Sequence, residues 1–400
     1  MITKNLIEML FSAASMQRWN DHPKPVEFTE IDKQAHKLII AYVLAKLEED
    51  AGSAIDWNAL IEGGIFEFIH RIRLTDLRPD VFHRLMAECG DALNDWVFKG
   101  SRTDLEAFDK SFFGRFKSYF RAKNGGEIEK RILNAAHYLA TKWEFRIIYN
   151  IAPFLYGIDA TKEALDREIE KHRELACVKK ILSEPKLAGF IDLCGQLRFQ
   201  QRWAQSPRIP KTSVLGHMLF VAMLGYFFSV EAGIKSKMRI RNNFLCGLFH
   251  DLPEVLTKDI ISPIKSSVGG LGRLIRDYES RSINEKILPL LPISWHGEIL
   301  RYITEEFSNR LLVEGKPRTI NGDIPKDYDS DLYGAIDGEL IEACDKYAAF
   351  IEASLSIQYG IHTPYLKDGM EKIYKAFAAK KVQGLRFKPF FDYFYPDKLP

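Results

Sequence analysis

The residues of this sequence best suited to metal chemistry are the adjacent His250 and Asp251. Neighbouring imidazole and carboxylate groups can offer one nitrogen and one oxygen to a single divalent cation. Two further ligand-type residues, His217 and Asp345, each stand inside an apolar stretch with helical spacing. The order His, His-Asp, Asp therefore predicts one metal site that is built from three separate segments.

Glu254 is the candidate acid or base beside that site. It follows His250 by four residues and Asp251 by three, so on a helix its carboxylate lies on the same side as the pair. A carboxylate in that place can orient or deprotonate an attacking water. The alternative interpretation is a solvated helix carboxylate without a chemical role.

A histidine on an apolar helix face is more often a hydrogen-bonded core residue than a ligand. That reading fits His36 and His70, which have no set of partners at ligand spacing. His217 differs because the His-Asp pair and Asp345 complete a mixed set of imidazole and carboxylate ligands. Such a set favours Mn, Co, Fe, Ni or Zn over calcium, so we expect one divalent transition metal per chain.

Taken together, His217, His250-Asp251 and Asp345 resemble the four metal ligands of the HD-domain phosphohydrolase superfamily. The resemblance covers about residues 190 to 365. It implies an all-α fold and a metal-dependent phosphohydrolase.

Within that superfamily, several residues resemble the bacterial 5′-deoxynucleotidases (YfbR-like): Arg202-Trp203, Glu254, Asp259 at the end of Leu-Thr-Lys-Asp, and the segment from Pro263 to Lys265. The resemblance implies that Arg202 holds the substrate phosphate, as a guanidinium fork can. It gives Trp203 the role of a wall against the sugar and Lys265 that of a phosphate contact. Asp259 becomes a second catalytic carboxylate, and which of Glu254 and Asp259 is the acid and which the base is left open. The alternatives are a helix N-cap for Asp259 and a loop anchor for Trp203.

The expected activity is release of phosphate from (deoxy)nucleoside 5′-monophosphates, with a small-molecule nucleotide as the substrate. One alternative is hydrolysis of another nucleotide, cyclic or hyperphosphorylated. Another is a nucleotide-sensing or scaffolding protein. Gly216 stands before the first ligand where this family commonly has Glu, which leaves the choice of substrate open.

The length of 400 residues exceeds one hydrophobic core, so we expect two domains. Apolar residues recur at helical spacing throughout, and no strand-like alternation is long enough for a sheet, so the predicted class is all-α. Tandem HD-domain-like helical bundles are expected: a degenerate copy over 1–160, a helical connector over 161–185 and the phosphohydrolase domain over 186–400.

An internal repeat supports the tandem arrangement, because landmarks of the second half recur in the first in the same order. Both acidic ligands would be replaced by cations in the first copy, which predicts that it binds no divalent metal. The paired landmarks are Arg18-Trp19 with Arg202-Trp203, His36 with His217, His70-Arg71 with His250-Asp251, and Lys142 with Asp345.

A formal net charge of +2 gives no reason to expect nucleic-acid binding. The five cysteines show no CxxC spacing, so we expect reduced thiols in a cytoplasmic protein. The apolar stretch 214–230 is expected to be a buried core helix and not a membrane span. A homo-oligomer, or an intrachain pseudo-dimer of the two copies, is a further expectation.

Overall fold

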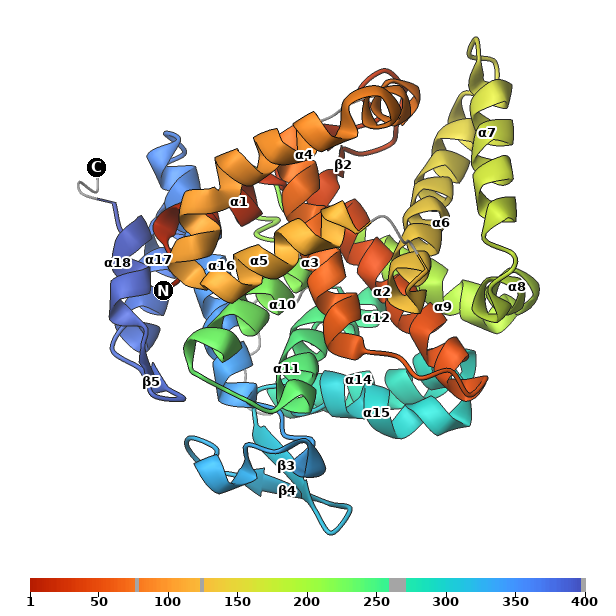
Figure 1. Cartoon of the computed structure of the whole chain (residues 1–400). Helices are drawn as coiled ribbons and strands as arrows, with labels where there is room; N and C mark the ends of the chain where they lie inside the picture. Colours follow the sequence, from red (N-terminus) through yellow and green to blue (C-terminus); the bar gives the residue numbers. More distant parts are fainter. Residues whose placement is uncertain (76–78, 123–125, 259–270, 397–400) are drawn as a thin grey trace. The chain divides into compact units, whose positions relative to one another are not determined.

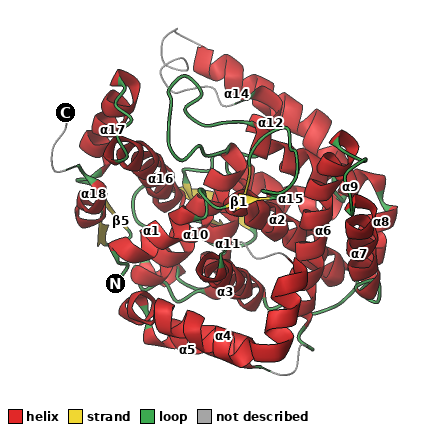
Figure 2. Ribbon diagram, turned by 90° about the horizontal axis from the view of Figure 1, so that it is seen from above, coloured by secondary structure: helices red, strands yellow, loops and turns green. Residues whose placement is uncertain are grey.

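The computed structural model describes residues 1–75, 79–122, 126–258 and 271–396. Helices dominate these residues, and the few strands are short (Figures 1 and 2). The predicted all-α class is thereby confirmed. The chain separates into two compact units, Met1–Lys180 and Ile181–Pro400.

The first unit is built mainly of long helices, with one small antiparallel pair of strands. The segment predicted as a connector forms most of its last two helices. Its elements are α1 (Lys4–Ser12), β1 (Gln17–Arg18), β2 (Phe28–Thr29), α2 (Glu30–Asp50), α3 (Trp57–Leu74), α4 (Pro79–Phe108), α5 (Lys110–Arg121), α6 (Ile128–Ile151), α7 (Ile158–Lys171) and α8 (Ala176–Ser183), which ends beyond the boundary.

Helix α2 is the central helix of the first unit and is buried along almost its whole length. It begins where the Thr29 side chain accepts a hydrogen bond from the backbone N–H of Asp32, as an N-cap residue does. It packs against α6. The buried residues of α2 include Lys33 and Lys37, so this core must compensate charge.

The second unit is also helical, with one longer hairpin. Its elements are α9 (Pro185–Gln196), η1 (Leu197–Phe199), α10 (Val214–Glu231), α11 (Lys237–Phe249), α12 (Glu254–Thr257), α14 (Leu271–Ser282), η2 (Ile283–Ile287), η3 (Leu288–Leu290), α15 (Ile293–Ile303), β3 (Asn309–Val313), β4 (Lys316–Ile320), η4 (Lys326–Tyr328), η5 (Asp331–Tyr333), α16 (Gly338–Gln358), α17 (Pro364–Phe377), β5 (Lys381–Val382), β6 (Leu385–Arg386) and α18 (Lys388–Phe394).

Helix α10 forms the centre of the second unit and contacts both α11 and α16. It starts at the N-cap Ser213, whose side chain accepts from the N–H of Gly216 at 2.9 Å. Among the described helices, it is the one whose length and apolar composition would suffice to cross a bilayer. Nearly all of it is buried in the unit, as expected for a core helix.

Helices α10 and α11 approach each other closely at Gly247. A Cβ atom at that position would lie 2.8 Å from the backbone N and Cα of Ala222. Only a residue without a side chain allows this distance. The approach brings His250, which directly follows α11, next to α10.

The apolar spacing of residues 296–313 predicts one helix, but the structure divides this segment into a helix and a strand. Helix α15 ends at Ile303, and 309–313 form strand β3, which pairs with β4. The two residues between the strands, Glu314 and Gly315, have φ angles of 52° and 74°. Left-handed backbone at both positions is typical of a tight two-residue hairpin turn.

The aromatic tail, residues 387–394, packs back onto the second unit. Phe390, Phe391 and Phe394 of α18 are buried. The ring of Phe391 lies 5.0 Å from that of Tyr347 and 4.9 Å from that of Phe350, both in α16. These contacts fix α16, the helix that carries Asp345.

Candidate metal centre

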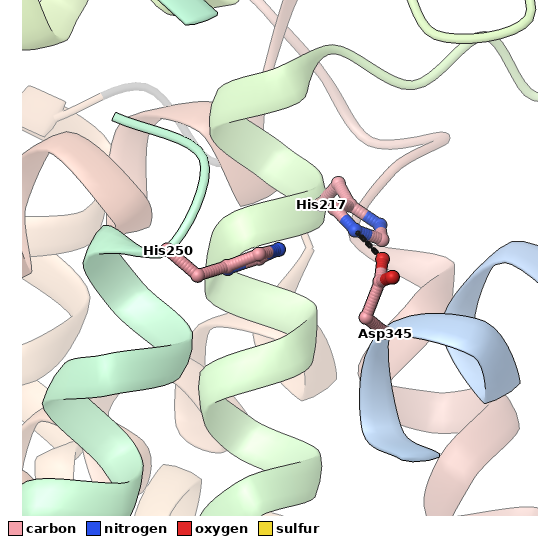
Figure 3. A group of neighbouring side chains, drawn as sticks. All are labelled: His217, His250 and Asp345. Carbon is pink, nitrogen blue, oxygen red and sulfur yellow. Dashed lines mark hydrogen bonds and ion pairs between the residues drawn. The ribbon is translucent and has the colours of Figure 1, made fainter. Parts of the chain in front are cut away.

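The structure brings His217, His250 and Asp345 together in the core of the second unit. Their ligand atoms all lie within 4.8 Å of one another, and all three residues are buried. The Nε2 atom of His217 is 2.9 Å from Oδ1 of Asp345. Figure 3 shows the side chains converging from α10, from the end of α11 and from α16. Such a group can hold a metal ion.

His250 is oriented in the way that a metal-binding histidine requires. Its Nδ1 lies 2.8 Å from the carbonyl oxygen of Gly247. A carbonyl only accepts, so Nδ1 carries a proton, and in the neutral ring Nε2 is left with a lone pair. That Nε2 is buried and makes no hydrogen bond among the described residues. The residues of this cluster therefore fit a divalent cation.

Asp251 borders the same cluster. Its Oδ2 is 3.2 Å from Nε2 of His250 and 3.9 Å from Nε2 of His217. Its side chain is partly exposed, at 18%. The carboxylate thus lies on the solvent side of two imidazoles, in reach of an ion that they share.

The electrostatics of the cluster favour a positive charge. Burial disfavours charged His250, but Asp251 and Asp345 outweigh this effect and raise the pKa of His250 to about 9. Burial also opposes ionisation of Asp345, yet Lys346 and His217 hold its pKa well below the usual value. A divalent ion would compete with the imidazole proton for this position.

Glu254 does not continue the helix that carries His250, contrary to the expectation from their spacing. Helix α11 ends at Phe249, and Glu254 begins the single turn α12. Pro253 has no N–H to extend the helical hydrogen bonds. Residues 250–253 instead form a tight turn, in which the N–H of Glu254 donates to the carbonyl of Asp251 at 3.0 Å.

Arg202 lies beside the cluster. Its Nη1 is 3.6 Å from Oδ2 of Asp251, and its Nε is 3.3 Å from Oε2 of Glu352. The guanidinium is therefore held between two carboxylates. Its proximity to Asp251 is compatible with the predicted phosphate contact, which remains a prediction.

The contacts of Trp203 favour the loop-anchor alternative. Its indole N–H donates to Oε2 of Glu352 at 2.9 Å. Its ring packs so closely on α17 that a Cβ at Gly369 would lie 2.7 Å from it. Its φ of 56° marks a tight turn. The predicted sugar wall remains a prediction.

Two of the predicted site residues, Asp259 and Lys265, lie outside the described residues, as does Pro263.

Three charged residues near the cluster were not predicted from the sequence. Glu352 is buried two helical turns after Asp345. Lys346 pairs with Oδ2 of Asp345 at 2.7 Å. Burial raises the pKa of Glu306, whose carboxyl interacts electrostatically with His250. Glu352 and Asp345 are spaced so that they lie on the same face of one helix. This spacing was the one signal in the sequence that could have pointed to Glu352.

The landmarks predicted for the first unit form no such cluster among the described residues. The ring of His36 packs on Trp143, with centroids 5.0 Å apart. His70 bonds to the side chain of Asn94 at 2.9 Å. These two histidines therefore have core contacts, as their lack of ligand partners suggested.

The two cations predicted to replace the acidic ligands lie in different surroundings. Arg71 contributes to the buried charges, with its Nε 3.7 Å from Oε2 of Glu30. Lys142 is on the surface of the first unit, where it pairs with Asp166 at 2.6 Å. Lys142 therefore does not fill the place of a metal ligand.

The comparison with known families agrees with this geometry. Residues 194–374 match the family model of the HD domain. The matched segment includes the His217, His250 and Asp345 cluster together with Asp251 and Arg202. The similarity supports the HD-domain superfamily for this segment and points to metal-dependent phosphohydrolase chemistry in general. No curated protein matches the chain significantly.

Proposed function

We propose that this protein releases phosphate from (deoxy)nucleoside 5′-monophosphates in a metal-dependent hydrolysis. The observation that carries the proposal is the buried meeting of His217, His250 and Asp345, bordered by Asp251 and Arg202. Two imidazoles and two carboxylates suit a divalent transition metal, and a guanidinium beside them suits a phosphate.

In this proposal His217, His250, Asp251 and Asp345 hold one ion of Mn, Co, Fe, Ni or Zn. Such an ion supplies Lewis acidity at a phosphate oxygen and lowers the pKa of a bound water. The turn 250–253 keeps Asp251 near both imidazoles.

The remaining residues act on protons and on the substrate. Glu254 orients the attacking water and accepts its proton as the water oxygen attacks phosphorus. The phosphorus–O5′ bond breaks, and Asp259 returns a proton to the leaving oxygen. Arg202, with Lys265, neutralises the phosphate. Trp203, which also anchors its loop, limits the space at the sugar.

We infer further that the first unit is an altered copy of the second. In each unit a short antiparallel pairing closes the turn before the central helix. Gln17 pairs with Thr29 in the first unit, and Gln201 pairs with Ser213 in the second. When the two sequences are aligned on these paired residues, Lys33, rather than His36, corresponds to His217.

The charges of the first unit suit this inference. The Nζ of Lys33 lies 2.6 Å from Nδ1 of His137, a contact that resembles that of His217 with Asp345. Lys33 and His137 offer no carboxylate to an ion, so we expect the copy to bind no divalent metal.

The proposed activity can be tested by measuring phosphate release from a nucleotide panel with added Mn or Co. The panel contains 5′-monophosphates of ribo- and deoxynucleosides, cyclic nucleotides and hyperphosphorylated nucleotides. We expect turnover of the 5′-monophosphates, and a loss of at least about 100-fold in kcat for Asp251→Ala and for Glu254→Ala.

Asp166→Ala, at an exposed pair in the first unit, is the control and should keep full activity. Phosphate release that neither substitution affects would refute the mechanism. Turnover confined to the cyclic or hyperphosphorylated compounds would refute the substrate class.

A further inference from the structure

Glu352 is a buried carboxylate on which several side chains of the second unit converge. It is 1% exposed. Its Oε2 accepts from the indole N–H of Trp203 at 2.9 Å and from Nε of Arg202 at 3.3 Å. Its Oε1 accepts from the hydroxyl of Thr212 at 2.7 Å. Glu352 therefore connects α16 with both ends of the turn before α10.

The same carboxylate also faces His217. Its Oε1 is 3.6 Å from Nδ1 of the imidazole, while Nε2 on the other side of the ring is 2.9 Å from Asp345. The ring thus lies between two carboxylates. The separation of 3.6 Å is too long for a hydrogen bond, and Nδ1 makes none among the described residues. A negative charge there still favours the ring orientation that directs N–H toward Glu352 and Nε2 toward the cluster.

The first unit also contains a glutamate that accepts hydrogen bonds from an Arg-Trp pair. Glu144 of α6 accepts from the indole N–H of Trp19 at 2.9 Å and from Nε of Arg18 at 3.0 Å. Trp19 and Trp203 share the left-handed backbone, with φ angles of 55° and 56°. The contact of a glutamate with an Arg-Trp turn is therefore a feature of the framework in both units. Glu352 in addition faces the imidazole of His217.

We propose that Glu352 is a positioning residue of the metal centre, which orients His217 so that Nε2 faces the ion and holds Arg202 beside it. This inference rests on the proposed function, since it assumes that the cluster binds metal. Removing a carboxylate that orients a metal-binding histidine typically lowers metal affinity by about 10- to 100-fold.

The test compares Glu352→Gln with Glu144→Gln, its counterpart in the first unit. Glutamine keeps the size and one acceptor oxygen but removes the charge. Affinity for Mn or Zn alone is measured by competition with a chelator, and thermal unfolding is followed in parallel. We expect both variants to lower the melting temperature, because both weaken an Arg-Trp turn. We expect Glu352→Gln alone to weaken metal binding, by about 10- to 100-fold.

Wild-type metal affinity in Glu352→Gln, or an equal loss in Glu144→Gln, would overturn the proposal. If Glu352→Gln does not fold, Glu352→Asp is used instead. Aspartate keeps the charge, but its side chain is one methylene shorter, so the carboxylate lies farther from His217. A folded Glu352→Asp with unchanged affinity would also overturn it. Because no substrate is used, metal binding that depends on Glu352 in a protein without phosphatase activity would refute the proposed function alone.

Discussion

His250 shows how a side chain acquires a chemical role from its neighbours. The carbonyl of Gly247 accepts a hydrogen bond from Nδ1 of its ring. The acidic residues around Nε2 make a cation favourable there. His70 has the same chemistry in principle, but Asn94 and a stacked Phe120 surround it. Burial lowers the pKa of His70, so it stays a neutral core residue.

The buried charges of the first unit lead to a prediction at the same scale, about acid stability. Burial disfavours ionised Glu30, but Arg18, Lys33 and Arg71 outweigh it and lower the pKa of Glu30 to about 2. The pKa is depressed in the folded state. The stabilisation is therefore complete above the unfolded value of about 4.5 and is lost as the pH falls toward 2.

We expect Glu30→Gln to cost on the order of 3 kcal/mol of unfolding free energy at pH 7, and progressively less below pH 4.5. Urea unfolding at a series of pH values measures the difference from wild type. Glu163→Gln, at an exposed position of α7, is the control and should cost little at any pH. A cost for Glu30→Gln that stays constant with pH would contradict the prediction.

At the scale of elements, the centre depends on the distance between α10 and α11. His217 is in the first turn of α10, and His250 follows the last residue of α11. The two imidazole rings are 5.6 Å apart between centroids. Gly247 sets that distance because the helix backbones touch there.

Gly247→Ala should therefore move α11 away from α10. The atoms that a Cβ would meet belong to the backbone of Ala222, which cannot turn aside. We expect a loss of about 1–3 kcal/mol in stability, together with weaker metal binding, because His250 is displaced. Denaturant unfolding and metal titration measure the two effects.

Gly297→Ala in α15 is the matched control, because no atom lies within 4 Å of its added Cβ. It should leave metal binding unchanged and leave stability unchanged or slightly improved. Metal affinity retained in Gly247→Ala would show that the close approach does not position His250.

At the scale of the whole molecule, the two units differ in the chemistry of their buried polar residues. The second unit holds imidazoles and carboxylates that converge. The first unit holds Lys33 and Arg18 with Glu30 and Glu144. Arg18 pairs with both carboxylates, while burial lowers the pKa of Lys33 well below its ordinary value. Among the described residues, the cluster of His217, His250 and Asp345 is the one group of three such side chains near enough to share an ion.

This difference predicts one metal ion per chain. Elemental analysis after saturation with Mn or Co and removal of excess ion should give a ratio near one. Asp345→Asn should reduce the ratio toward zero, because it removes a carboxylate at the centre of the cluster. Lys33→Met should leave the ratio unchanged. Two ions in wild type would contradict the interpretation of the first unit.

The sequence by itself determined the helical class and the residue types of the cluster. Helical periodicity is a local property, and His250 and Asp251 are adjacent in the chain, so both features can be recognised from neighbouring residues. The order of His217, His250 and Asp345 indicated the centre without its geometry.

Only the tertiary structure decided which side chains meet across long separations. His217 and Asp345 are 128 residues apart, and Trp203 and Glu352 are 149 apart. The hairpin at 309–320 and the turn after His250 also depend on backbone pairing that periodicity does not report. Contacts of this kind arise from the packing of whole helices. The spacing within α16 places Glu352 on the same face as Asp345, but it does not predict the contacts with Arg202 and Trp203 on which the proposed role of Glu352 depends.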